Sequence, residues 1–537
     1  NANINFNIVI LQSGATTSSC FAIDNGIGST ALSNTININN NSIQIGYPTA
    51  TTGVYNAIYN SASAAVVNIN NNTITQISGV ALAGTGTHVM IETGSPTTVN
   101  TNNNTIQNIS RNGTSGLWRG IKTTSPTNWI CNNNLIENLS WTAPTSTGSI
   151  DAIYSFSSAV NVTCNGNIIR NLSTPATGTI NGIREFGVAG TKIFQNNQVY
   201  NFSTTSGGAG GATFNGIYCT VGNIEISSNQ IYNLNSTGTT GGTAGTVYGI
   251  QISGSTTSNS NIFKNNIYNL STLSTNPVVA GIRISAGTTN YAFNNFISDL
   301  RTPAANAANP LIGISVTGGT TVGLYYNTVF LNASSSGALF GSSAILASTT
   351  PTLDLRNNVF VNLSTPNGAT GYTVAYRRSG TTLTSYAATS NANDFYAGTP
   401  SANNLIFFDG TNSDQTIAAY KTRVSPRDPN SFSENPPFVN ATTAPYDLHL
   451  NPSIATQLES GGTPVTSPLA INDDFDGNAR NATNPDVGAD EFNGTPLDLT
   501  PPAITYTPLL NTGSTSARTL VASITDPSGV PTSGIGL

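Results

Sequence analysis

The sequence predicts an all-β solenoid, and three observations support this: a phrase that recurs at a fixed period, short stretches of alternating apolar residues, and a shortage of charge. Charged residues make up 7% of the 537 residues, against about 25% in an ordinary globular protein. Asn, Ser, Thr and Gly dominate instead, which is typical neither of a charged disordered chain nor of a helical protein. The hydrophobic 37% suffices for a long, thin core between stacked sheets.

The recurring phrase is a run of asparagines followed by an alternating apolar segment. It reads NNNTITQIS from Asn70, NNNTIQNIS from Asn102, NNNLIENLS from Asn132 and NNIYNLS from Asn265. Its first apolar residue recurs about every 30 to 36 residues, which is a solenoid period. These residues are Ile43, Ile74, Ile106, Ile136, Ile169, Val199, Ile231, Ile267, Ile297, Val329 and Val359.

A second marker, usually Gly-Ile or Ala-Ile, keeps the same period, so one period is one coil. Its positions are Ile58, Val89, Ile121, Ile153, Ile183, Ile217, Ile250, Ile282, Ile314 and Ile345. Each coil has room for three short strands with period-2 alternation, which is typical of β-structure and not of helical repeats. The prediction is a right-handed parallel β-helix of about eleven to thirteen coils over residues 1–400, with three sheets around one core.

Stacked asparagines are predicted at two corners of the coils. Identical amides in register can hydrogen-bond along the axis, satisfy the backbone of a tight turn and tolerate the left-handed conformation there. The first ladder comprises Asn41, Asn72, Asn104, Asn134 and Asn167. The second comprises Asn108, Asn138, Asn171, Asn201, Asn233 and Asn269. Cys131 and Cys164 each precede a ladder asparagine by three residues and are predicted to be neighbouring buried thiols without a disulfide.

This repeat resembles the PbH1-type right-handed parallel β-helix family, the architecture of pectate lyases and of many bacterial surface proteins. The resemblance covers roughly Ile36 to Phe395. It implies the fold but says little about function, because many different activities share this scaffold.

Residues 401–496 are predicted to cap the open end of the solenoid, which would otherwise expose core and strand edges. The last part resembles the closing segment of bacterial secreted β-helix proteins, with the sequences DFDGNAR from Asp474 and DVGADE from Asp486. Its carboxylates leave two alternatives. In the first alternative a calcium ion, which prefers hard oxygen ligands on flexible loops, is bound by Asp474, Asp476, Asp486 and Asp490. In the second, the same carboxylates form turns and salt bridges around Arg480. Apart from calcium, no cofactor is expected.

Residues 497–537 resemble the first strands of an immunoglobulin-like β-sandwich. Such a domain needs about 100 residues, so we expect the module to continue beyond Leu537. The order of β-helix, cap and immunoglobulin-like module is similar to that of large surface proteins exported by type IX secretion. This resemblance implies a bacterial, secreted or cell-surface location and, as partners, a secretion or surface-anchoring machinery.

Composition argues against several other partners. The net charge is −6, and no basic stripe of the density that phosphate backbones require is present, so nucleic acid is not expected. The sequence contains no run of about 18 apolar residues, so no transmembrane helix is predicted. Four cysteines without CxxC spacing and two histidines argue against zinc sites and a disulfide framework.

Two outward columns are candidate binding sites for a polysaccharide. Residues directly after the Gly-Ile marker form the first column, which includes Tyr154, Arg184, Tyr218 and Arg283. Residues directly after the other marker form the second, which includes Tyr200, Tyr232 and Tyr268. Aromatic faces on a rigid sheet can stack on sugar rings, and basic groups beside them can engage acidic sugars. The alternative is that tyrosine is simply a good strand residue that stacks with its own kind.

The first function predicted is an adhesive or structural module of a large bacterial surface protein, in contact with a glycan. The alternative is a carbohydrate-active enzyme, a polysaccharide lyase before a glycoside hydrolase. A lyase needs a base beside metal-binding carboxylates, and a hydrolase needs two carboxylates at a defined separation. Acids are sparse in the repeat, and the nearest mixed cluster is Arg170, Arg184, Glu185 and Asp151. The sequence therefore favours binding over catalysis, and no catalytic residue is assigned.

Overall fold

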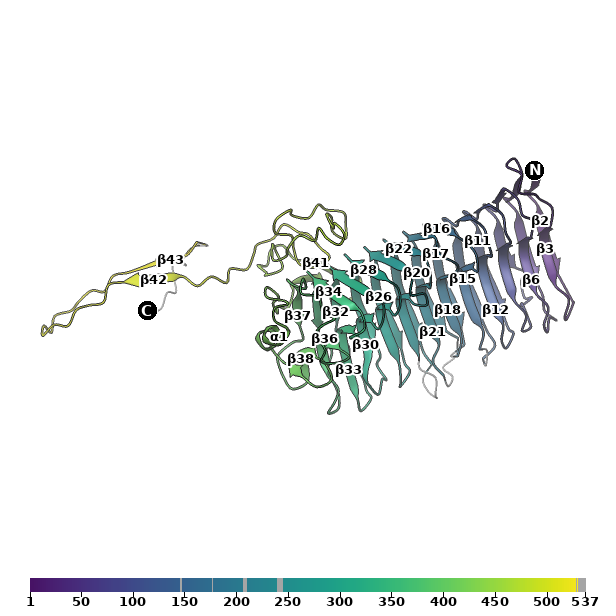
Figure 1. The fold of residues 1–537 in the computed structure, drawn as a ribbon. Coiled ribbons are helices and arrows are strands. Elements are labelled where there is room, and N and C mark those ends of the chain that lie inside the picture. Colours follow the sequence, from purple (N-terminus) through teal and green to yellow (C-terminus); the bar gives the residue numbers. More distant parts are fainter. Residues whose placement is uncertain (145–146, 176, 206–209, 239–244, 528, 530–537) are drawn as a thin grey trace.

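The protein is a parallel β-helix, which confirms the predicted fold. The computed structural model describes residues 1–144, 147–175, 177–205, 210–238, 245–527 and 529. Three long parallel sheets wind around one core, and the chain visits them in turn, so that each sheet gains one strand per coil. Figure 1 shows the resulting rod, along which the chain advances from the N-terminus at one end.

The three sheets are named A, B and C in the order in which the chain reaches them. Sheet A consists of β1 (Ala2–Asn5), β4 (Thr35–Asn39), β7 (Val66–Asn68), β10 (Thr98–Asn100), β13 (Asn128–Ile130), β16 (Asn161–Asn165), β19 (Thr191–Gln195), β22 (Asn223–Ser227), β25 (Asn259–Phe263), β28 (Thr289–Phe293), β31 (Thr321–Tyr325) and β34 (Thr352–Arg356). Sheet B consists of β2 (Ile8–Gln12), β5 (Ser42–Gly46), β8 (Thr73–Gln76), β11 (Thr105–Arg111), β14 (Leu135–Trp141), β17 (Ile168–Thr174), β20 (Gln198–Thr204), β23 (Gln230–Ser236), β26 (Asn266–Thr272), β29 (Phe296–Arg301), β32 (Thr328–Leu331), β35 (Val359–Asn362) and β37 (Asp394–Tyr396). Sheet C consists of β3 (Cys20–Asn25), β6 (Tyr55–Asn60), β9 (His88–Thr93), β12 (Leu117–Thr123), β15 (Ser149–Phe156), β18 (Thr179–Phe186), β21 (Thr213–Cys219), β24 (Thr246–Ile252), β27 (Val278–Ile284), β30 (Ala307–Val316), β33 (Phe340–Ala347), β36 (Thr373–Arg378), β38 (Asn404–Phe408) and the antiparallel β39 (Ser413–Asp414).

The core is built by residues at equivalent positions of successive coils. Ile106 pairs with Ile136, and both are fully buried. Cys131 and Cys164 follow paired residues of β13 and β16, and both are buried, free thiols, as predicted. One continuous hydrophobic cluster therefore runs through the inside of the solenoid.

The observed register differs from the predicted marker columns in two coils. In β9, Ile91 and not Val89 occupies the core column. In β35, Phe360 and not Val359 pairs with Val329. Both strands contain several consecutive apolar residues, so alternation alone does not determine which of them faces the core.

A ladder of buried asparagines follows the corner between sheets A and B. The Nδ2 of Asn134 donates to the carbonyl of Thr101 at 2.8 Å and to Oδ1 of Asn167 at 3.0 Å. Its Oδ1 accepts from the backbone N–H and the Nδ2 of Asn104 at 2.9 and 3.0 Å. The same pattern links Asn41, Asn72, Asn104, Asn134, Asn167, Asn197, Asn229, Asn265, Asn295, Asn327, Asn358 and Asn393. The ladder ends on Asp428, whose Oδ1 accepts from Asn393 at 3.0 Å.

A second, exposed stack of asparagines lies in the middle of sheet B. The Nδ2 of Asn138 donates to Asn108, and that of Asn171 donates to Asn138, each at 2.9 Å. All members have a positive φ of 53° to 58°, a left-handed conformation that asparagine tolerates better than most residues. They are Asn108, Asn138, Asn171, Asn201, Asn233 and Asn269.

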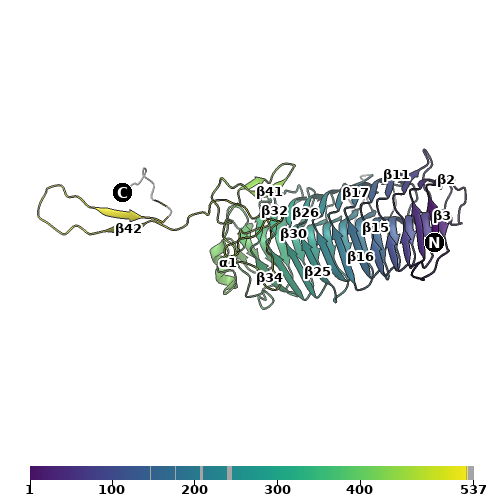
Figure 2. The same ribbon diagram turned by 90° about the horizontal axis from the view of Figure 1, so that it is seen from above.

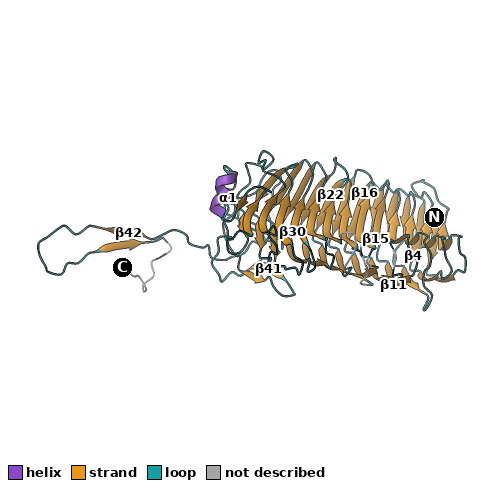
Figure 3. Ribbon diagram, turned by 90° about the horizontal axis from the view of Figure 1, so that it is seen from below, coloured by secondary structure: helices purple, strands orange, loops and turns teal. Residues whose placement is uncertain are grey.

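Helix α1 (Ile417–Val424) closes the C-terminal end of the solenoid (Figure 3). The side chain of Thr416 caps its N-terminus, and Tyr420 and Val424 complete the hydrophobic core. The hydroxyl groups of Tyr420 and Tyr386 both donate to Asp428, at 2.6 and 2.5 Å. The same carboxylate thus ends the asparagine ladder and holds the terminal aromatic residues.

Residues 435–492, called the flank segment below, lie along the side of the last coils and not over the end (Figure 1). They include the antiparallel pair β40 (Phe438–Asn440) and β41 (Asp447–Leu450). Lys264 and Asp473 form a salt bridge of 2.7 Å across the contact, and the hydroxyl of Tyr326 donates to the carbonyl of Thr463. The region predicted to be one cap therefore has two parts, an end cover around α1 and this flank segment.

Beyond the flank segment, β42 (Ala503–Tyr506) and β43 (Ala522–Thr525) pair as an antiparallel hairpin that projects past the solenoid (Figure 2). Most of its large apolar side chains are exposed, among them Ile504, Tyr506 and Leu510. An immunoglobulin-like module at 497–537 stays a prediction, and residues 528 and 530–537 of that range lie outside the described residues. Within the part of the chain that the structure describes, none of the helices has the length and hydropathy of a membrane span.

Candidate functional site

The first predicted column lies on the outer face of sheet C. Strand register places Tyr154 beside Arg184 and Arg184 beside Tyr218. Gln251 and Arg283 continue the column on β24 and β27. The structure therefore brings together the four residues predicted for this column.

A second outward column runs parallel to it, three residues earlier in each strand. It contains Arg119, Asp151, Asn181, Asn215 and Tyr248 on successive strands. Sequence reasoning missed this column because strict alternation places outward residues two apart, not three.

The three-residue spacing comes from one extra small residue in the Gly-Ile or Ala-Ile marker, which is glycine on β18 and β21 and Ala152 on β15. Gly216 is the extra residue between the outward positions of Asn215 and Tyr218. A Cβ at Gly216 would lie 2.5 Å from the carbonyl oxygen of Gly249 on the next coil, a contact that only glycine avoids. The marker therefore sets the distance between the two columns as well as the packing of the strand.

A shallow groove of about 390 Å³ is lined by residues of both columns and crosses β15, β18, β21 and β24. Asparagine, threonine and tyrosine dominate its lining, and Arg184 is the one charged residue among the described lining residues. The lining residues are Ser149, Thr179, Asn181, Arg184, Thr213, Asn215, Tyr218, Thr246, Tyr248 and Gln251.

Asp151 lies at the head of the groove and fixes the position of Arg184. Its side chain is fully buried, and its Oδ1 accepts from Asn181 at 2.7 Å. Arg119 and Arg184 both lie 3.5 Å from this carboxylate. Two guanidinium groups share one carboxylate, so this end of the groove carries an excess positive charge.

Tyr154 supports the two arginines and does not offer a free ring. It is only 3% exposed, and the guanidinium groups of Arg119 and Arg184 lie 4.4 and 5.1 Å from its ring centroid. Burial raises the pKa of its phenol. Tyr154 was predicted as a stacking surface, but both arginines occupy its surroundings, so it acts through them.

Two phenylalanines that the sequence analysis did not single out provide the exposed aromatic surface. Phe156 and Phe186 are 37% and 45% exposed at the ends of β15 and β18. The ring of Phe156 lies 5.5 Å from that of Tyr154, and Arg184 lies 5.5 Å from the ring of Phe186. They follow column residues by two positions, so continuing the outward alternation to the strand ends would have found them.

The second predicted column, on sheet B, stacks against itself. The rings of Tyr200 and Tyr232 lie 4.6 Å apart at 7°, and those of Tyr232 and Tyr268 lie 4.9 Å apart at 4°. Tyr446 of the flank segment covers the end of the stack at 5.9 Å, and Arg170 donates to the hydroxyl of Tyr200 at 3.0 Å. The faces of these rings are thus covered by neighbouring rings. This agrees with the alternative interpretation, that strand tyrosines stack with their own kind.

Of the mixed cluster predicted from the sequence, Arg184 and Asp151 come together at 3.5 Å, whereas Glu185 and Arg170 lie elsewhere. Arg184 points outward into the groove, whereas Glu185 is fully buried inside the solenoid and pairs with Lys192 at 3.2 Å. Burial raises the pKa of Glu185, although the charge of Lys192 opposes the shift. Arg170 lies on another sheet, beside Glu137. The reason is alternation, since neighbouring residues of a strand face opposite sides.

The four aspartates predicted to bind calcium divide into two groups. Asp474 and Asp486 accept hydrogen bonds from backbone N–H groups of the flank segment itself. Asp476 and Asp490 lie with His449, and the ligand atoms of these three residues are within 4.8 Å of one another. An imidazole with two carboxylates does not match the shell of about six to eight oxygens that calcium takes, so calcium remains a prediction.

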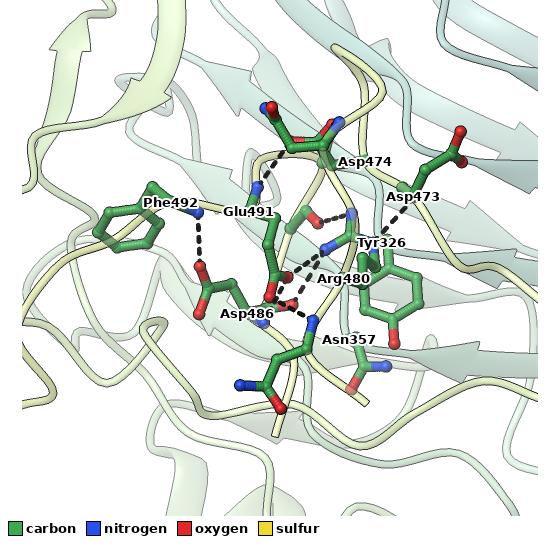
Figure 4. Close-up of polar contacts among 12 residues, drawn as sticks. Tyr326, Asn357, Asp473, Asp474, Arg480, Asp486, Glu491 and Phe492 are labelled. Atoms are coloured by element: carbon green, nitrogen blue, oxygen red, sulfur yellow. Dashed lines mark hydrogen bonds and ion pairs between the residues drawn. The ribbon is translucent and has the colours of Figure 1, made fainter. Parts of the chain in front are cut away.

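Arg480 is the centre of the contact between the flank segment and the solenoid (Figure 4). Its Nη2 donates to Oδ1 of Asn294 at 2.8 Å, and its Nη1 lies 3.1 Å from Glu491. The guanidinium also lies 3.9 Å from the ring centroid of Tyr326. This arrangement corresponds to the second alternative for the acidic cluster, turns and a salt bridge around Arg480.

The fold defines the chain as a parallel β-solenoid protein. No protein-family model matches it, and no curated protein matches it either. The outer face of sheet C carries amides, hydroxyl groups, exposed aromatic rings and an anchored arginine on one rigid surface. These groups can bind a polyhydroxylated chain, and the described lining residues offer no pair of carboxylates for hydrolysis.

Proposed function

We propose that this chain is an extracellular structural module of a large bacterial surface protein, and that it binds a polysaccharide on the outer face of sheet C without cleaving it. One observation carries the proposal: Arg184, which lines the groove, lies 5.5 Å from the exposed ring of Phe186, and the exposed ring of Phe156 is on the neighbouring strand of the same sheet. Exposed aromatic rings beside convergent amides are the groups that protein surfaces use to hold sugars.

The rigidity of the sheet supports binding to an extended chain. Successive strands lie about 4.8 Å apart, so the groove repeats similar polar groups along the axis of the solenoid. A polymer that lies along it makes several weak contacts at once, and these contacts add. A preformed face also avoids the entropic cost of ordering loops.

The cellular part of the proposal rests on the order of segments and not on the groove. A solenoid followed by an end cover, a flank segment and an exposed hairpin is consistent with a module within a longer surface protein. Export by type IX secretion and attachment to the cell surface are the corresponding partners that we propose. Detection of the protein on intact cells with an antibody against the solenoid would test this part.

Affinity electrophoresis of the purified chain in gels that contain single polysaccharides tests the binding. We expect at least one polysaccharide to retard the chain, and the double substitution of Phe156 and Phe186 with alanine to abolish the retardation. Tyr506→Ala, which removes an exposed ring from the distant hairpin, serves as the matched control. Retardation that persists in the double variant would move the binding site away from sheet C.

A product assay with the same polysaccharides separates binding from catalysis. Release of reducing ends or of unsaturated sugars by the wild-type chain would refute the non-catalytic part of the proposal and favour the lyase alternative.

A further inference from the structure

Two polar atoms of the groove make no hydrogen bond within the protein. One is Oδ1 of Asn215 and the other is Nε of Arg184, and both atoms are buried. Asn215 is only 4% exposed, and both residues line the groove. Buried polar atoms of folded proteins are nearly always paired, so an unpaired acceptor and an unpaired donor in one groove point to a ligand that satisfies both.

The orientation of Asn215 follows from a chain of hydrogen bonds that starts at Asp151. An ionised carboxylate only accepts, so Asn181 must turn its Nδ2 toward Asp151, at 2.7 Å. The Oδ1 of Asn181 then faces the next coil and accepts from Nδ2 of Asn215 at 2.8 Å. The Oδ1 of Asn215 is left at the end of the chain, where Tyr248 replaces a further amide. The Oδ1 of Asn215 is therefore a buried acceptor without a donor in the protein.

Charge determines what the arginine side of the groove accepts. The carboxylate of Asp151 is shared between Arg184 and Arg119, and Arg283 adds a further positive charge on the same column. The whole chain carries a net charge of −6, so this excess of positive charge is local. A buried guanidinium N–H forms its strongest hydrogen bonds with anionic oxygens.

We infer that the groove binds an anionic sugar, whose carboxylate or sulfate group accepts from Nε of Arg184 while a neighbouring hydroxyl donates to Oδ1 of Asn215. This inference rests on the proposed polysaccharide-binding function and specifies its ligand class. Arg184 and Asn215 are the specificity-determining residues, and the exposed phenylalanines contribute affinity that is independent of the ligand's charge.

Isothermal titration with three polysaccharides tests the inference: alginate as a polyuronate, carrageenan as a sulfated chain and laminarin as a neutral chain. We expect one of the two anionic chains to bind more tightly than laminarin, and the preferred one identifies the acid group. Binding should weaken as salt is added. Arg184→Gln should weaken binding by about tenfold, because it removes the charge-assisted contact to the anionic group. Asn215→Asp should weaken it by about tenfold as well, because its negative charge opposes the anionic ligand at the hydroxyl contact.

Arg301→Gln is the matched control, since Arg301 is a half-exposed arginine on sheet B, paired with Asp299. It should bind like the wild type, and circular dichroism should show that all variants are folded. Equal or tighter binding of laminarin, or unchanged binding by Arg184→Gln, would overturn the inference while leaving polysaccharide binding intact. Binding to none of the three chains would reject the inference, whereas the proposed function would fall only if no polysaccharide retards the chain in affinity electrophoresis.

Discussion

Replacing Asn134 with alanine should destabilise the solenoid, because this side chain makes four hydrogen bonds to neighbouring coils. Two run from its Nδ2 to Thr101 and Asn167, and two run to its Oδ1 from Asn104. The amide of Asn104 keeps a bond to the carbonyl of Ile69, and Asn167 keeps one from the backbone of residue 134. The backbone N–H of Asn104 and the carbonyl of Thr101 lose their ladder partner.

The magnitude follows from those two buried groups. An unpaired buried donor or acceptor costs about 1 to 3 kcal/mol, so the free energy of unfolding should fall by roughly 2 to 6 kcal/mol. Loss of the asparagine also leaves a small cavity, which acts in the same direction. The change is a large fraction of the total stability of most domains, which is about 5 to 15 kcal/mol.

Urea denaturation followed by circular dichroism measures the effect. Asn261→Ala is the control, because Asn261 is an exposed asparagine in a strand of sheet A. Solenoid coils contact only their neighbours, so amide hydrogen exchange should locate the loss of protection in the coils around residue 134. A denaturation midpoint equal to that of the wild type, with an equal slope, would refute the view that the buried ladder stabilises the coils.

Three further predictions concern the flank segment and the thiols. Arg480→Ala leaves a buried carboxylate without its partner, at a cost of about 3 to 5 kcal/mol, so limited proteolysis should release the flank segment from an intact solenoid. Burial raises the pKa of Asp486 to about 7, so the docked segment retains a proton that the undocked one releases. That contribution to docking is full below pH 4 and is lost between about pH 4 and pH 7, at about 1.4 kcal/mol per pH unit, so protease sensitivity should increase over this range and level off above pH 7. Cys131 and Cys164 should resist thiol reagents in the native protein and react in urea; modification before unfolding would contradict their burial.

The fold could be predicted because one local pattern repeats in almost every coil. A single marker such as Ile106 is ambiguous, but its recurrence at a fixed period defines strands, coils and sheets together. Prediction failed where the pattern is locally degenerate, as at Val89, where consecutive apolar residues fit two registers. Contacts outside the repeat could not be predicted either, because the flank segment contains no repeated pattern that indicates which coils it touches.

The candidate site was only partly predictable for a related reason. The column of Arg184 and Tyr218 follows from alternation within strands. The column of Asp151 and Asn215 depends on one extra residue in each strand of the groove, Ala152 on β15 and a glycine on β18 and β21, and this shifts the outward position by one. The covering of Tyr154 by two arginines is a matter of side-chain packing between coils, which a one-dimensional pattern does not contain.

The flank segment gives the solenoid a mechanical property that stacking alone does not provide. A solenoid pulled from its last strand peels open one coil at a time, since each coil is held only by the next. Here tension applied through the hairpin would reach the flank segment first, and that segment is fastened to several coils, from Lys264 to Asn357. These attachments would have to yield together before the terminal coil is exposed, so the rod should resist extension at its C-terminal end more strongly than at its N-terminal end.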